Sequence, residues 1–79
     1  MNMYIGNLNY RVKENQLEEV LATYGAVNSV RIIKDRETGK SKGFGFAEME
    51  DTEAQQAIRE LNGCELMGRE LVIREATQK

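Results

Sequence analysis

The sequence predicts an α+β fold whose elements follow in the order β-α-β-β-α-β. Apolar residues recur at helical spacing in two segments, and short alternating segments rich in β-branched and aromatic residues surround them. That order suits a four-stranded antiparallel sheet with two helices on one face, the split β-α-β (ferredoxin-like) sandwich. The 79 residues are enough for one domain and not for two, so we expect a single domain spanning residues 1–79.

The first half of the pattern is a strand followed by a helix. Met3 and Ile5 alternate with Tyr4, which predicts a strand with Tyr4 on the face opposite the other two. One face of a helix is predicted by the i, i+3, i+4, i+7 spacing of Leu17, Val20, Leu21 and Tyr24. Gly25 stands in a helix-stop position. Lys13, by contrast, occupies a place where a hydroxyl or carboxylate would cap the helix better.

A second strand and a hairpin follow. The segment 27–34 is rich in β-branched residues, and alternation directs Val30 and Ile32 to the core and Arg31 and Ile33 to the other face. The polar loop 35–40 contains Gly39, which predicts a hairpin. The third strand is expected over residues 43–49.

The last third of the chain repeats the helix–strand pattern. A second helix, capped by Asp51 or Thr52, is predicted by the spacing of Ala54, Ala57, Ile58 and Leu61. Asn62-Gly63 predicts its end. Residues 64–68 are expected to form a short connection or a small hairpin, with Cys64 as a small apolar filler. Leu71 and Ile73 mark the last strand.

Composition disfavours several classes of protein. The single cysteine cannot form an internal disulfide, and without histidine a metal site is not expected. No apolar run is long enough to span a membrane, and MNMYIGN at the N-terminus does not resemble a secretory signal. We therefore expect a cytoplasmic protein. The chain also lacks a glycine-rich loop that opens a helix, so we expect neither an enzyme, such as a small phosphatase of the same layout, nor a cofactor.

The charge is unevenly distributed. The net charge of −2 counts against a nucleic-acid partner, because phosphate binding draws on basic surfaces. The segment 31–42 is nevertheless net positive, with five basic residues against two acidic ones. Its hairpin is either a solvated turn or a place of phosphate contact.

The face of the sheet away from the helices is the predicted contact surface. Alternation in the third strand directs Phe44 and Phe46 outward and Ala47 and Met49 inward, and Tyr4 is outward on the first strand. The chain has only five aromatic residues. Three of them on an uncovered face indicate a contact site, and flat nucleic-acid bases stack well on such rings. We assign no role to Tyr10, and we interpret Gly6 as a close-approach position.

Two motifs resemble a known family. The segment 42–49 (KGFGFAEM) resembles the ribonucleoprotein octamer of the RNA recognition motif (RRM), and the segment 3–8 (MYIGNL) resembles the companion hexamer. The resemblance covers the whole chain and extends to small single-motif RNA-binding proteins of bacteria. It implies single-stranded RNA as the partner, with single-stranded DNA left open, and a monomer. The alternative is a protein-interaction module of the same fold, which would use the helical face.

The resemblance also implies roles for individual residues. Tyr4 and Phe44 would each stack on a base, Phe46 would pack against sugar rings, and Lys42 would pair with a backbone phosphate. The contact surface would be widened by Arg31, Ile33 and Arg74, and the backbone of residues 74–76, ending at Ala76, would contact a base.

Two features depart from the family pattern. Ala47 and Met49 occupy positions that often hold valine and an aromatic residue, so we expect a slimmer core without loss of binding. No glycine-rich or basic tail follows the last strand. Together with the acidic net charge, this leads us to expect modest affinity.

Overall fold

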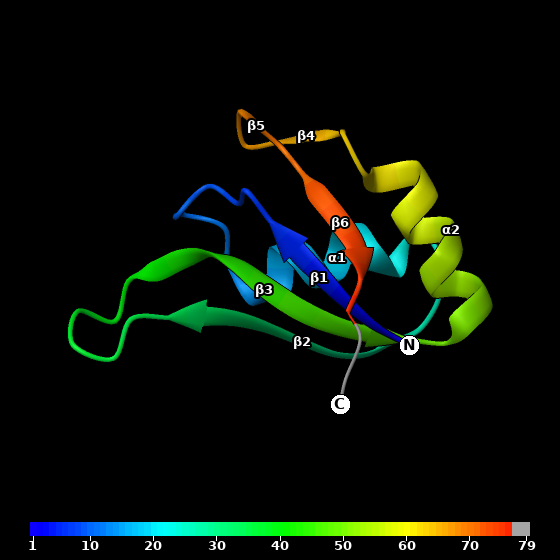
Figure 1. Ribbon diagram of the computed structural model, residues 1–79, viewed down its shortest axis with the longest axis horizontal. Coiled ribbons are helices and arrows are strands. Elements are labelled where there is room, and N and C mark those ends of the chain that lie inside the picture. The colour runs from blue at the N-terminus through cyan, green and yellow to red at the C-terminus, as the bar shows by residue number, and fades with distance from the viewer. Residues whose placement is uncertain (77–79) are drawn as a thin grey trace.

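The computed structural model describes residues 1–76 and has the predicted order of helices and strands. Figure 1 shows a twisted sheet with helices packed behind it. The elements are β1 (Asn2–Gly6), α1 (Glu14–Ala22), β2 (Val27–Lys34), β3 (Ser41–Met49), α2 (Asp51–Leu61), β4 (Glu65–Leu66), β5 (Arg69–Glu70) and β6 (Val72–Glu75).

The main sheet has four antiparallel strands in the order β2-β3-β1-β6. Its two central strands are β3 and β1, where Tyr4 pairs with Phe46 and Ile5 with Gly45. The strands that carry the two motifs are therefore hydrogen-bonded neighbours at the middle of the sheet. The predicted fold class is confirmed.

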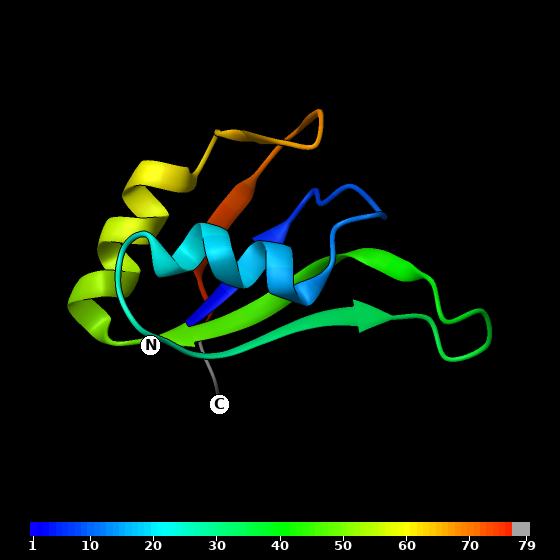
Figure 2. The same ribbon diagram turned by 180° about the vertical axis from the view of Figure 1, so that it is seen from behind.

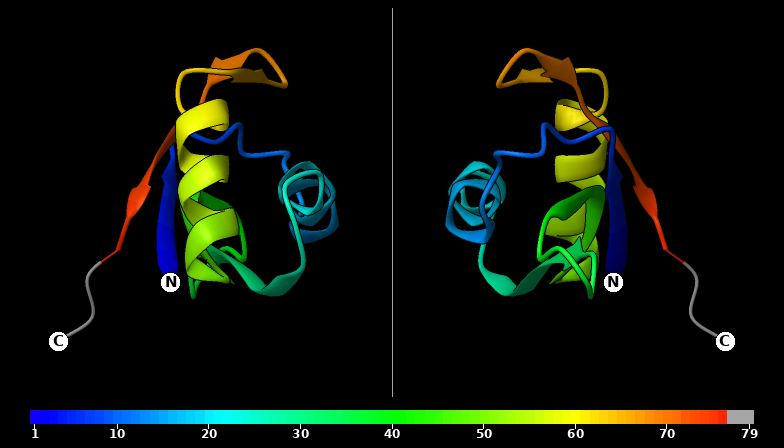
Figure 3. Two further views of the ribbon diagram at one scale, coloured as in Figure 1. Left: turned by 90° about the vertical axis from the view of Figure 1, so that its right-hand side faces the viewer. Right: turned by 90° about the vertical axis from the view of Figure 1, so that its left-hand side faces the viewer.

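Both helices lie on the same side of the main sheet. Figure 1 shows the strands in front of α1, and Figure 2, from behind, shows α1 in front of the strands. The edge-on views of Figure 3 place α2 beside β1 and β6 on that same side. Helix α1 packs against β2, and α2 packs against β6, β1 and β3. The opposite face of the sheet carries no helix in the described part of the chain.

The core lies between the sheet and the helices. Its largest fully buried side chains are Met3, Ile5, Leu8, Leu17, Leu21, Met49 and Leu71. Ala47 and Ile32 are also buried, as alternation along β3 and β2 predicts. Helix α1 buries Leu17 and Leu21, while Val20 and Tyr24 are partly buried against the same core. The predicted inward faces of the strands and helices are confirmed.

The helix starts differ from the simplest reading of the sequence. Lys13 is the N-cap of α1 and makes no side-chain cap hydrogen bond. Gln16 compensates, because its Oε1 accepts the Lys13 backbone N–H at 2.9 Å. The prediction that Asp51 or Thr52 caps α2 is wrong: the N-cap is Glu50, and Asp51 lies inside the first turn. A carboxylate there is still favourable, since it faces the positive end of the helix dipole.

The segment after α2 forms a hairpin of two short strands, β4 and β5. The expectation that Cys64 fills the core is wrong, because its side chain is exposed and its thiol donates to the carbonyl oxygen of Glu60 at 3.0 Å. A small apolar residue carries little information about its own burial at a helix end. The β4–β5 hairpin contributes Leu66 as a partly buried neighbour of the core instead.

Side chains tie the loop between β1 and α1 to the β4–β5 hairpin. Asn7 Nδ2 donates to the carbonyl oxygen of Glu70 at 2.6 Å, and Asn7 Oδ1 accepts from the Arg69 guanidinium at 2.7 Å. Asn9 Nδ2 donates to the carbonyl oxygen of Met67 at 3.0 Å. Asn7 has φ of 58°, a left-handed conformation that asparagine tolerates better than most residues. The loop is thus held in one position at the end of the sheet.

Candidate nucleic-acid interface

Three rings meet on the open face of the sheet, and we call Tyr4, Phe44 and Phe46 the aromatic cluster. Tyr4 comes from β1, and both phenylalanines come from β3. The ring centroids lie 6.0 Å apart for Tyr4–Phe44, 5.9 Å for Tyr4–Phe46 and 6.1 Å for Phe44–Phe46. The cluster forms because β1 and β3 are paired and the outward positions of neighbouring strands lie side by side.

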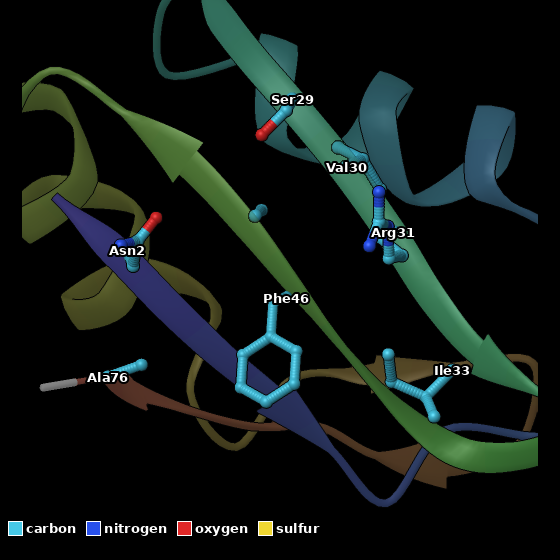
Figure 4. Close-up of a pocket in the computed structure, with 8 residues that line it drawn as sticks. Asn2, Ser29, Val30, Arg31, Ile33, Phe46 and Ala76 are labelled. Carbon is cyan, nitrogen blue, oxygen red and sulfur yellow. The ribbon is translucent and has the colours of Figure 1, made fainter. Parts of the chain in front are cut away.

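The three rings do not share one plane. Tyr4 and Phe44 are inclined by 29° to each other, whereas Phe46 is inclined by 66° to Tyr4 and 89° to Phe44. Phe46 is the most exposed of the three, with 40% of its surface accessible. Figure 4 shows the face of its ring turned toward the viewer, over β1 and β3. The Phe46 ring face is therefore open to a flat partner.

Two residues, Arg74 and Gly6, define the surroundings of the Tyr4 ring. The Arg74 guanidinium carbon lies 5.0 Å from the centroid of its ring, a cation–π distance. On the other side, a Cβ added at Gly6 would lie 2.5 Å from the Tyr4 hydroxyl oxygen and 2.7 Å from ring carbon Cε2. Glycine at position 6 thus leaves room for the Tyr4 ring, which confirms Gly6 as a close-approach position.

A shallow cavity of about 600 Å³ lies beside Phe46, and we call it the Phe46 groove. Its lining residues are Asn2, Ser29, Val30, Arg31, Ile33, Phe46, Ala47 and Ala76. Figure 4 shows that β1, β2 and β3 all contribute side chains, with Ala76 at the edge. The Ala76 backbone N–H donates to the carbonyl oxygen of Asn2 at 2.8 Å. That N–H is therefore not available to a ligand in the groove.

A smaller cavity of about 250 Å³ lies at the other end of the aromatic cluster, and we call it the Tyr10 cleft. It is lined by Tyr4, Asn7, Leu8, Tyr10, Lys42, Gly43, Phe44 and Arg69. Lys42 lies at the start of β3 and its side chain is exposed. A cation at the rim of an aromatic surface is positioned to meet a phosphate while a base lies on the rings.

One carboxylate of the β2–β3 hairpin, that of Asp35, accepts hydrogen bonds from the backbone of the same hairpin. Asp35 Oδ1 accepts the backbone N–H groups of Glu37 at 2.8 Å and Thr38 at 3.2 Å. Those hydrogen bonds, with a smaller effect from the charge of Lys42, lower the pKa of Asp35 below its usual value of 3.8. The carboxylate is therefore ionised at neutral pH and is used to shape the turn.

The structure brings together most of the residues predicted for the site. Tyr4, Phe44 and Phe46 form one cluster, Arg31, Ile33 and Ala76 line the groove beside it, and Arg74 lies over Tyr4. Lys42 lies at the opposite end of the cluster from this groove.

Asn2, Ser29 and Tyr10 are among the lining residues that sequence reasoning missed. Asn2 and Ser29 line the Phe46 groove, and Tyr10, which was given no role, lines the Tyr10 cleft with 68% of its surface exposed. The first two follow from strand alternation. The position of Tyr10 depends on a loop contact that no local pattern encodes.

The described residues contain neither a cluster of metal-binding side chains nor a membrane-spanning helix. Within residues 1–76, no group of three or more histidine, cysteine, aspartate or glutamate side chains is placed to hold a metal ion. No helix in the same range is long and apolar enough to cross a membrane. The aromatic cluster and the cavities around it are the strongest candidate for a binding site.

Comparisons with known proteins agree with this geometry. The family model of the RNA recognition motif matches residues 3–72. RbpA of Synechocystis is 49% identical over 77 residues, which cover 96% of this chain and 76% of RbpA. RbpB of Nostoc shows the same identity, over 96% of this chain and 75% of its own.

Solved structures give the same result. The crystal structure of the RNA-binding protein PG1 is similar with a TM-score of 0.96 and 54% identity, covering 100% of this chain and 96% of that one. The Rna15 RRM with bound RNA (GU) has a TM-score of 0.86 and 32% identity, covering 98% and 83%. The resemblance seen in the octamer and hexamer is thus confirmed, and the chain belongs to the RNA recognition motif family.

Proposed function

We propose that the protein binds single-stranded RNA on the open face of its main sheet, with bases stacked on the aromatic cluster. One observation carries the proposal. Three aromatic rings, whose centroids lie within 6.1 Å of one another, stand on a sheet face that carries no helix in the described chain. Exposed rings in contact with one another are costly in water unless a partner covers them. Stacking on a base stabilises a complex by about 1–3 kcal/mol per base. The family is one of binding domains and not of enzymes.

The exposed Phe46 ring supports a base-stacking role for this residue. The resemblance alone implied that Phe46 packs against sugar rings. Its 40% exposed surface and its place at the mouth of the Phe46 groove favour a base on its face instead. Phe44 is less exposed and stands at 89° to Phe46, so its ring edge is suited to the sugars between two bases.

Tyr4 and Arg74 together support a second stacking position. Arginine and aromatic rings both present flat faces to a base, and here the guanidinium already lies over the ring. We propose that the second base replaces the Arg74 guanidinium on the Tyr4 ring, or that it lies on the ring while the guanidinium stacks on the outer face of the base. Both arrangements use the same pair of residues.

Polar groups around the rings would hold the rest of the nucleotide. Arg31 and Ile33 widen the surface on the β2 side, and Lys42 is placed for a phosphate. Ala76 lines the Phe46 groove, and we propose that its carbonyl oxygen accepts a hydrogen bond from the edge of a base. Two related domains were solved with RNA, the Rna15 RRM and the Sex-lethal protein, which supports RNA as the partner here.

The alternative, a protein-interaction module, would need a contact surface on the helices. The large hydrophobic side chains that are most exposed are Tyr10, Phe46, Met67 and Val72. These belong to the β1–α1 loop, the main sheet and the β4–β5 hairpin. The open face is therefore favoured over the helical face. We also propose that the protein acts as a monomer, since a second copy on this face would compete with RNA.

Substitution of Phe46 tests the proposal. Phe46→Ala should weaken binding of a uridine- or guanosine-rich RNA oligomer by about 1–3 kcal/mol, because one stacking contact is lost. Fluorescence anisotropy with labelled RNA measures this. Met67→Ala is the matched control, because Met67 is equally exposed, at 41%, and lies on the β4–β5 hairpin. Equal affinity of Phe46→Ala and wild type would refute the proposal. A DNA oligomer of the same sequence measures what the 2′-hydroxyl groups contribute.

A further inference from the structure

Tyr10 is an exposed aromatic residue outside the aromatic cluster, and two cavities share it. On one side is the Tyr10 cleft, where Tyr10 lies with Tyr4, Phe44 and Lys42. On the other side is a cavity of about 650 Å³, which we call the cationic groove. Its lining residues are Tyr10, Arg11, Lys13, Lys34, Gly39, Lys40 and Ser41. Tyr10 therefore stands between the aromatic cluster and the β2–β3 hairpin.

The loop that carries Tyr10 is tied to its neighbours within the protein. The Leu8 backbone N–H donates to the carbonyl oxygen of Gly43 at 2.8 Å, which ties the loop to β3. Gly43 has φ of +84°, and a Cβ at that position would lie 3.1 Å from Cε1 of Tyr10. Glycine there lets the ring approach the start of β3. Together with the bonds of Asn7 and Asn9 to the β4–β5 hairpin, these contacts hold the loop that presents the ring, which lowers the entropic cost of binding.

The cationic groove concentrates positive charge in an acidic protein. The described residues that line it include four cations and no carboxylate, while the chain as a whole carries a net charge of −2. Two acids close to the groove residues in sequence, Glu14 and Asp35, are occupied by backbone groups. Glu14 Oε2 accepts the Ile32 N–H at 2.9 Å, and Asp35 Oδ1 accepts two N–H groups of the hairpin. Four uncompensated cations around a cavity favour a polyanion.

We propose that the RNA site extends beyond the aromatic cluster: one more base stacks on Tyr10, and the following phosphates enter the cationic groove. This inference rests on the proposed function and adds a subsite to it. An RNA chain that leaves the open face past Lys42 meets Tyr10 first and the four cations of the cationic groove next. Base and phosphate are then recognised by separate, adjacent surfaces, as single-stranded nucleic acid requires.

RNA oligomers of two lengths test this subsite. A uridine tetramer is long enough for the aromatic cluster, and a uridine octamer reaches the cationic groove as well. Wild-type affinity should rise by more than tenfold from tetramer to octamer, beyond the few-fold expected from additional binding registers. Tyr10→Ala should reduce that gain by a factor of about five or more, the effect of losing one stacking contact. Tyr10→Phe should retain the full gain. Tetramer binding should be the same in wild type and Tyr10→Phe, and Tyr10→Ala should lose less affinity for the tetramer than for the octamer.

Charge at the groove is tested with a matched pair of arginines. Arg11→Gln removes a groove cation, and Arg59→Gln removes an exposed cation on α2. The two variants have the same net charge. The slope of log affinity against log salt for the octamer should become shallower by about 0.7 in Arg11→Gln, the effect of one lost phosphate contact on a single strand. Arg59→Gln should keep the wild-type slope.

The outcomes separate this subsite from the function on which it depends. An octamer gain that persists in both Tyr10→Ala and Arg11→Gln, with tetramer binding intact, would overturn the subsite and leave the proposed function standing. Failure of the wild-type tetramer to bind would overturn the proposed function itself. Circular dichroism of Tyr10→Ala verifies its fold, and Arg11→Gln, an exposed position, provides the second independent variant.

Discussion

The two faces of the main sheet are built from the same strands and differ in how deeply their side chains are buried and in which side chains they carry. On the covered face, Met3, Ile5, Ala47 and Met49 are at most 2% exposed. On the open face, Tyr4 lies between Met3 and Ile5 in sequence, and Phe44 and Phe46 alternate with Gly45 and Ala47 along β3. The period of two in a strand allows one segment, 42–49, to serve both purposes. Core packing and the proposed RNA contacts therefore fall on alternate residues of the same strand.

This separation makes a clear prediction about substitutions. A change on the covered face should reduce the free energy of unfolding and leave the affinity of the folded protein intact. A change on the open face should do the opposite.

Met3→Ala should have the largest effect, and on stability alone. Met3 is fully buried, and truncation of a buried methionine costs about 2–5 kcal/mol through lost contacts and the cavity left behind. Urea denaturation measures the loss, and RNA titration at low urea measures the affinity of the folded fraction. If Met3→Ala changed affinity as strongly as stability, the two faces would not be independent.

Gly6→Ala should affect binding more than stability. A Cβ at position 6 would occupy the space of the Tyr4 ring, and the ring would have to swing away. We expect an affinity loss of about 1 kcal/mol, the lower value for one stacking contact, and little change in unfolding free energy. Isothermal titration calorimetry gives the affinity. The loss should disappear when the same change is made in a Tyr4→Ala background, because no ring then occupies that space.

Lys42→Gln should change the salt dependence more than the affinity. Loss of one phosphate contact reduces the slope of log affinity against log salt by about 0.7. Anisotropy titrations at several salt concentrations measure this slope. A slope equal to that of wild type would show that Lys42 does not touch phosphate, and the stacking surface would be unaffected by that result.

The smallest effect concerns the β2–β3 hairpin and pH. Because the folded pKa of Asp35 is lowered from 3.8, its carboxylate stabilises the fold above that value, and this contribution is lost as pH falls through the lowered pKa. Thermal melting of wild type and Asp35→Asn over this range should show a stability difference that shrinks toward acid pH. A difference independent of pH would mean that the charge of Asp35 plays no part in the turn.

Much of the fold was predictable because it depends on local patterns. Alternation correctly assigned Tyr4, Phe44 and Phe46 to the open face, and helical spacing placed Leu17 and Leu21 in the core. The errors concern positions without such a pattern. The cap of α2 fell on Glu50, one residue before the expected pair, and Cys64 is exposed because its thiol bonds back to the helix.

The part of the site that sequence reasoning missed depends on contacts between distant segments. Tyr10 is placed by the hydrogen bond of Leu8 to Gly43 and by asparagine bonds to the β4–β5 hairpin. The cations of its groove come from the β1–α1 loop, β2 and the β2–β3 hairpin. Such a surface appears only once the chain is folded. The orientation of Phe46 relative to Phe44 is likewise a property of packing and not of spacing.

The most direct test of the central claim is the double substitution Phe44→Ala/Phe46→Ala, measured for RNA affinity and unfolding free energy in parallel. We predict that RNA binding falls by at least the larger of the two single effects, about 1–3 kcal/mol, while the cooperative unfolding transition is retained. Wild-type affinity for RNA in a folded double variant would contradict the account, because the open face would then not be where the bases bind.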